Sequence, residues 1–154
     1  MRVFIAAALA LIASTSLNAQ TALPSADYTT ATPLAGTWFY SPAPDGSEAM
    51  FLNTSAQPQF IIHCTRATRR VNLSRPAAGA APFLFVWTSS DKRNLPASFK
   101  PATARLVAEL PAFDPLLDAI AFSRGRFAIG VLGAPAAVLP TWPEPTRVIE
   151  DCRA

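Results

Sequence analysis

The two side chains best suited to covalent chemistry are adjacent in the sequence. His63 is the only histidine, and it precedes Cys64, one of two cysteines. A thiolate activated by an imidazole is a common nucleophile in hydrolases. Residues 59–65 have the pattern of a β-strand, however, in which neighbouring side chains point to opposite faces. We therefore expect a solvent-facing imidazole and an inward-facing sulfur, and not a catalytic pair.

Other sets of catalytic or metal-binding residues are missing from the sequence. One histidine and two cysteines are too few for a usual zinc site. No nucleophile elbow, phosphate-binding loop or dinucleotide fingerprint occurs. The closest carboxylates are Asp114 with Asp118 and Glu150 with Asp151, and a helix cap explains Asp114 better than acid catalysis does. We predict a protein that is not an enzyme and that needs no cofactor or metal.

The first 19 residues have the pattern of a secretory signal peptide. Arg2 supplies a positive charge, residues 3–13 are apolar, and a small polar region ends at Ala19. The apolar run is too short to cross a bilayer. We predict cleavage after Ala19, with Ser16 and Ala22 as alternative sites. The expected protein is periplasmic or secreted and has no transmembrane segment after cleavage.

The predicted compartment determines whether the two cysteines are expected to be bonded or free. In an oxidising environment, Cys64 and Cys152 are expected to form a disulfide. The bond would fasten the C-terminal segment to a central strand, and the loop-entropy relation gives it roughly 4–5 kcal/mol of stabilisation. The alternative is a pair of buried free thiols.

Six basic side chains could form a surface that binds anions. They are Arg66, Arg69, Arg70, Arg75, Lys92 and Arg93. The four arginines at 66–75 belong to one predicted hairpin, and the other two lie in a predicted long polar loop, 89–101. If this loop folds over the hairpin, the patch could hold a carboxylate, a phosphate or an acidic glycan. The alternative is a solvated strand face whose charges protect a sheet edge.

The overall charge is modest. The chain has 13 Lys plus Arg against 10 Asp plus Glu, a formal net charge of +3. This is too small to indicate a nucleic-acid partner.

Short strands dominate the predicted secondary structure. Eight segments have β-branched, aromatic or alternating apolar patterns: 37–40, 48–52, 59–65, 69–75, 83–88, 104–110, 127–132 and 136–139. Tight turns join most of them, which favours antiparallel pairing. The chain is therefore predicted to be mainly β, a small antiparallel β-sandwich or barrel of about eight short strands with one or two short helices. We expect a flexible N-terminal arm at 20–33 and a single β-rich domain at 34–154.

Two helices are indicated. Asp114 suits the N-cap and Pro115 the first turn of a helix that would end with Arg124 in its last turn and Gly125 as its stop. Residues 141–144 resemble a capping box. A short helix or an alternating strand would then run through Cys152.

A Gly-x-Trp at Gly36 and Trp38 opens the first strand. It resembles the start of lipocalins and of small exported protease-inhibitor barrels. That resemblance implies a barrel that binds an apolar ligand or inhibits a secreted hydrolase. Residues 21–33 could serve as an arm that enters a protease cleft.

A second resemblance covers more of the chain. An early Trp strand, a mid-chain strand with Cys64, a basic hairpin and a C-terminal Cys152 are similar to small exported bacterial β-proteins such as the invasion-associated locus B family. This implies location and architecture. Our leading hypothesis is an exported binding or envelope-accessory protein that contacts an anionic ligand, a glycan or an envelope protein.

Overall fold

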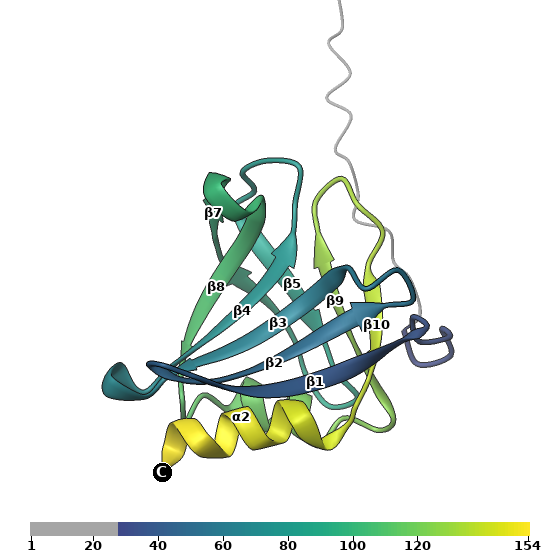
Figure 1. Ribbon diagram of the computed structural model, residues 1–154. Helices are drawn as coiled ribbons and strands as arrows, with labels where there is room; N and C mark the ends of the chain where they lie inside the picture. Colours follow the sequence, from purple (N-terminus) through teal and green to yellow (C-terminus); the bar gives the residue numbers. More distant parts are fainter. Residues whose placement is uncertain (1–27) are drawn as a thin grey trace, which may run out of the picture.

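The computed structural model describes residues 28–154, which form two antiparallel β-sheets packed face to face (Figure 1). The predicted mainly-β class is confirmed, and the structure is the predicted β-sandwich and not the predicted barrel. Within these residues the sheets do not close into a barrel. The predicted signal peptide at 1–19 and residues 20–27 of the predicted arm lie outside the described residues.

The larger sheet has six strands in the order β1-β2-β3-β4-β8-β7. They are β1 (Gly36–Ala43), β2 (Gly46–Asn53), β3 (Pro58–Thr65), β4 (Arg70–Pro76), β8 (Arg105–Pro111) and β7 (Ser98–Lys100). The smaller sheet has the order β10-β9-β5-β6. Its strands are β10 (Ala137–Pro140), β9 (Arg126–Val131), β5 (Phe83–Trp87) and β6 (Lys92–Pro96). Single 3-10 turns, η1 (Arg66–Thr68) and η2 (Pro101–Thr103), precede β4 and β8.

The segment 89–101 was predicted to be a long loop, and this is wrong. It contains β6, which pairs with β5, and β7, which pairs with β8. Ala97 lies between the two strands, so one continuous segment passes from the smaller sheet to the larger. Both are edge strands with few buried side chains. Leu95 is the only buried side chain in them. Their polar sequence therefore reflects their position at the edge.

Aromatic side chains fill the space between the sheets. Trp38 packs against Phe51 and Phe127, with ring centroids 5.4 and 6.3 Å apart, and Phe60 lies 6.0 Å from Phe127. The indole N–H of Trp38 donates to the carbonyl of Pro140 at 2.9 Å. The one polar atom of this ring is therefore paired, and burial of its apolar surface stabilises the fold.

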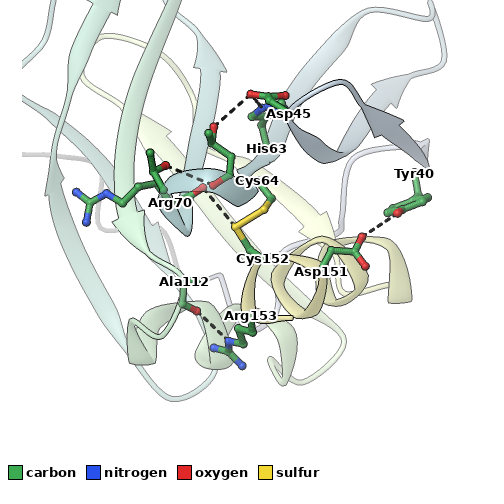
Figure 2. Close-up of a disulfide and its surroundings, with 11 residues drawn as sticks. Tyr40, Asp45, His63, Cys64, Arg70, Ala112, Asp151, Cys152 and Arg153 are labelled. Atoms are coloured by element: carbon green, nitrogen blue, oxygen red, sulfur yellow. Dashed lines mark hydrogen bonds and ion pairs between the residues drawn. A yellow bond between two sulfur atoms is a disulfide. The ribbon is translucent and has the colours of Figure 1, made fainter.

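Helix α2 (Pro143–Arg153) lies across one end of the sandwich (Figure 1). The helix, and not the alternative strand, is therefore the structure of this segment. Val148, Ile149 and Cys152 form its buried face. The predicted disulfide between Cys64 and Cys152 is confirmed, with Cα atoms 5.5 Å apart (Figure 2). The bond fixes the helix to β3 near the centre of the larger sheet.

The predicted capping box at 141–144 is wrong. Trp142 is the N-cap of α2 and makes no side-chain capping bond. Pro143 forces the residue before it out of helical geometry, so the helix starts one residue later than a Thr141 cap would require. Thr141 Oγ1 and Glu144 Oε2 are both buried and have no hydrogen-bond partner within residues 28–154.

Helix α1 (Pro115–Ala121) starts where the sequence predicted. The carboxylate of Asp114 accepts a 2.9 Å hydrogen bond from the backbone N–H of Leu116. The helix ends at Ala121, however, so Arg124 and Gly125 lie in the turn that leads to β9. Gly125 has a φ of 74°, which favours glycine.

Neither helix of residues 28–154 has the length and apolar character needed to cross a membrane.

Candidate functional site

An open cleft of about 700 Å³ lies at one end of the smaller sheet. The turn from β5 to β6 forms one wall, and the turn from α1 to β9 forms the other. Its lining combines aromatic rings, hydroxyls and charged groups, including Tyr28, Trp87, Ser89, Asp91, Lys92 and Arg124. Volumes of this size are usual for small-molecule sites.

The first wall is a hydrogen-bonded turn built around Thr88. Its hydroxyl accepts from the backbone N–H groups of Asp91 at 2.8 Å and Ser90 at 3.3 Å. The same hydroxyl donates to the Asp91 carbonyl at 2.9 Å. Threonine and serine commonly stabilise turns in this way. The short loop between β5 and β6 therefore has a defined shape despite its polar sequence.

Two serines join this turn to the second wall. The buried Ser123 hydroxyl accepts from the Ser89 N–H at 2.9 Å and donates to the Arg126 carbonyl at 2.5 Å. The Ser89 hydroxyl accepts from the Arg124 N–H at 3.1 Å. The backbone of each wall is therefore held by hydrogen bonds to the other wall. The charged side chains project from these held backbone positions.

An aromatic pair forms a further side of the cleft. The rings of Tyr28 and Trp87 lie 4.5 Å apart with an interplanar angle of 37°. Trp87 lies over Gly130 of β9, where a Cβ atom would stand 2.8 Å from Cζ3 and 2.9 Å from Cη2 of the indole. Glycine at this position therefore allows the indole to lie against the sheet.

Residues 28–34, which we call the strap, are hydrogen-bonded to the smaller sheet, and these bonds fix the position of Tyr28. The Ala31 carbonyl accepts from the guanidinium of Arg126. The Leu34 N–H donates to the Val138 carbonyl at 2.8 Å. Burial raises the pKa of the Tyr28 hydroxyl, and this outweighs the opposite effect of Arg75. The phenol is therefore neutral near pH 7 and can donate a hydrogen bond.

The charges of the cleft are unbalanced. Lys92 and Arg124 are exposed, and within residues 28–154 neither makes an ion pair. Asp91 is the one carboxylate that residues 28–154 contribute to the lining, and its Oδ1 accepts from the Lys92 N–H at 2.7 Å. Arg126 is a third cation of the lining, and it is bonded to the Ala31 carbonyl. Three cations beside one carboxylate favour an anionic ligand.

The predicted basic patch is not assembled as the sequence suggested. Lys92 and Arg93 belong to the smaller sheet, and the premise that a loop carries them over the hairpin is wrong. Arg93 forms a two-point ion pair with Asp114, at 2.8 and 3.0 Å. Arg70 pairs with Glu109 at 2.8 Å.

Arg75 is also engaged within the fold. It lies on the same face of β4 as the buried residues, because alternate strand residues share a face. Its guanidinium donates to the carbonyls of Ile129 and Pro135, each at 2.5 Å, and so links the two sheets. Burial lowers the pKa of this guanidinium. Arg66 and Arg69 remain exposed in the turn around η1.

His63 and Cys64 lie on opposite faces of β3, as predicted. The imidazole Nε2 is 3.1 Å from Asp45 Oδ2 (Figure 2). The imidazole Nδ1 is 3.5 Å from Glu48 Oε2. The hydrogen bond from His63 is the main reason that the pKa of Asp45 lies below its usual value. The sulfur of Cys64 is fully buried in the disulfide.

Comparison with known proteins does not assign this site. No family model matches the chain, and neither the curated proteins nor the solved structures gave a significant match. The resemblances to lipocalins and to the invasion-associated locus B family therefore stay predictions. The chemistry of the residues carries the functional argument.

Proposed function

We propose that the protein is an exported, non-enzymatic binding protein that holds an anionic ligand in the cleft beside Trp87. The observation that carries the proposal is the presence of two exposed cations, Lys92 at the start of β6 and Arg124 in the turn before β9, beside turns that Ser89 and Ser123 join by hydrogen bonds. A backbone that is already held by hydrogen bonds loses less conformational freedom when an anion binds than a mobile one does.

The export part of the proposal has two supports. Residues 1–19 have the signal-peptide pattern. The Cys64–Cys152 disulfide belongs to the class of bonds that persist in oxidising compartments. Both fit a periplasmic or secreted location.

The cleft is the stronger of two candidate anion surfaces. Arg66 and Arg69 share a turn of the larger sheet and are exposed, but η1 has no buried residue and neither cation lines the cleft. Lys92 is the one residue of the predicted basic set that lines it. The hairpin arginines serve as the natural comparison in a test.

The alternative of a barrel that holds an apolar ligand gains no support from the fold. The two sheets of residues 28–154 stay separate, and large aromatic rings such as Phe51, Phe60 and Phe127 fill the space between them. The alternative of an inhibitory arm depends on residues 21–33. Of these, residues 28–33 belong to the strap, and the others lie outside the described part of the chain.

The test is calorimetric titration of the mature chain with inorganic phosphate, citrate and trigalacturonate at low and physiological salt. The variant Lys92→Glu with Arg124→Glu reverses the two exposed cations of the cleft. We expect it to weaken binding of the preferred anion by at least about tenfold, because it replaces attraction by repulsion. Binding should also weaken as salt rises.

The matched control is Arg66→Glu with Arg69→Glu, which makes the same change in net charge on another turn. We expect it to leave the affinity within about twofold of the parent. If the control pair abolishes binding and the cleft pair does not, the site is the hairpin turn and the cleft assignment is wrong. If none of the three anions binds, the proposed function is wrong.

A further inference from the structure

We propose that the ligand of the cleft is an acidic saccharide, an inference that rests on the proposed anion site. Its carboxylate would face Lys92 and Arg124, and one of its sugar rings would lie against the Tyr28–Trp87 pair. Three features of the cleft together narrow the class of anion.

The first feature is the carboxylate of Asp91. It lines the same cleft as the two cations, and within residues 28–154 it makes no ion pair with them. Only Oδ1 has a hydrogen-bond donor there, the Lys92 N–H at 2.7 Å. An ionised carboxylate accepts hydrogen bonds and repels other anions. A densely charged ligand without hydroxyls, such as polyphosphate, would meet this repulsion, whereas a saccharide hydroxyl can donate to Asp91.

The second feature is the aromatic pair. Trp87 and Tyr28 both line the cleft, and both are partly exposed. Aromatic side chains that combine an apolar ring with a polar group suit ligands that have both kinds of surface. A pyranose ring presents apolar C–H faces and polar edges, so it can cover the rings while its hydroxyls reach the walls. A small inorganic anion would use neither ring.

The third feature is the set of hydroxyl groups on the wall. Thr88, Ser89 and Ser90 are consecutive and all line the cleft. Thr88 is used within its own turn, but within residues 28–154 the side chain of Ser90 makes no bond. Ser90 can therefore both donate to and accept from a ligand hydroxyl. The cleft is open and not an enclosed cavity, which admits a chain of sugars as well as a single one.

The experiment compares three probes on the mature chain with its disulfide intact. They are trigalacturonate, neutral cellotriose of the same chain length, and citrate, a compact trianion without a sugar ring. We expect trigalacturonate to bind at least about tenfold more tightly than either comparator, because only it uses both the cations and the aromatic pair. The indole N–H resonance of Trp87, which lines the cleft, should shift on binding.

Tyr28→Ala separates ring stacking from charge. Tyr28 lies in the strap and not in the core, so the variant should fold, which a thermal melt checks. We expect it to weaken trigalacturonate binding by about fivefold or more and to leave citrate binding unchanged. Phe39→Ala removes an aromatic ring that is 54% exposed on the other sheet, and it should change neither affinity.

The outcomes distinguish this inference from the proposed function. If citrate binds as tightly as trigalacturonate and Tyr28→Ala has no effect, the cleft is a simple anion site and the saccharide inference is wrong. If cellotriose binds as tightly as trigalacturonate, charge is not used and the anionic part of the proposed function is wrong as well. Loss of trigalacturonate binding in Phe39→Ala would place the ligand on the other sheet and overturn both.

Discussion

The hydroxyl of Tyr40 donates a 2.8 Å hydrogen bond to the carboxylate of Asp151, a residue 111 positions later in the chain (Figure 2). The guanidinium of Arg147 lies 3.8 Å above the same tyrosine ring. Together with the disulfide from Cys152 to β3, these contacts hold α2 against both β1 and β3. The helix is therefore fixed at two separate places on the larger sheet.

The contribution of the Tyr40 contact can be measured with Tyr40→Phe. The substitution keeps the ring and its contact with Arg147 but removes the donor to Asp151. We expect a loss of about 1–2 kcal/mol in the free energy of unfolding, measured by urea titration, since hydrogen bonds to charged groups are among the stronger ones. A stability equal to that of the parent would mean that water replaces the hydroxyl at no cost.

The disulfide should contribute much more to the free energy of unfolding than the Tyr40 hydrogen bond does. Cys64 and Cys152 are 88 residues apart and fully buried. Replacing both by Ala removes the cross-link without leaving a free thiol, and loop entropy alone predicts a loss of roughly 4–5 kcal/mol. The measurement is urea unfolding of this variant beside the oxidised parent, with the reduced parent as control. If all three unfold at the same urea concentration, the cross-link does not stabilise the native state.

Gly130 should be intolerant of a side chain. A Cβ atom there would lie 2.8–2.9 Å from the indole of Trp87. We expect Gly130→Ala to lower the free energy of unfolding by about 1–3 kcal/mol through overpacking, and to shift the Trp87 indole resonance. The control is Gly79→Ala, where a Cβ atom meets nothing within 4 Å. Equal stability of the two variants would show that the indole moves aside freely and that its placement in the cleft is not fixed.

The ion pair between Arg93 and Asp114 should make stability depend on acidity. Burial raises the pKa of the Asp114 carboxyl, but hydrogen bonds from Arg93 and the Leu116 N–H outweigh this and hold the pKa below its usual value. The stabilisation is therefore complete above the unfolded-state pKa, about 3.9, and is lost as the pH falls through the lower folded-state pKa.

Asp114→Asn tests this dependence, because asparagine still caps the helix but cannot form the ion pair. We expect the difference in unfolding free energy between the parent and the variant to be constant from about pH 7 to 5. It should shrink below about pH 4. A difference that persists unchanged at pH 2 would mean that the pair does not lower the pKa of Asp114.

Much of the fold could be predicted because it depends on local patterns. The alternation in residues 59–65 placed Cys64 inward and His63 outward, and the Asp114–Pro115 pair marked the start of α1. The edge strands β6 and β7 were missed because strands that bury few side chains do not need an apolar pattern. The start of α2 differs from the capping-box spacing of 141–144 because Pro143 holds Trp142 in an extended conformation, so that the helix begins at Pro143.

The cleft could not be predicted in the same way. Tyr28, Trp87, Lys92 and Arg124 come from four separate segments, and only the pairing of β5 with β6 and β9 brings most of them together. The sequence did carry one partial signal. Thr88, Ser89 and Ser90 form a run of hydroxyls directly after an apolar strand, which indicates a structured turn as well as a loop.

The position of α2 at the end of the described chain has a consequence for the order of folding during synthesis. The inner face of the larger sheet is translated long before the helix that covers one end of it, and Cys64 emerges from the ribosome 88 residues ahead of its partner. Until α2 has been translated, β1 lacks Asp151 as its partner and this end of the sandwich lacks its covering helix. The contacts that fix this end of the sandwich therefore form only after α2 has been translated.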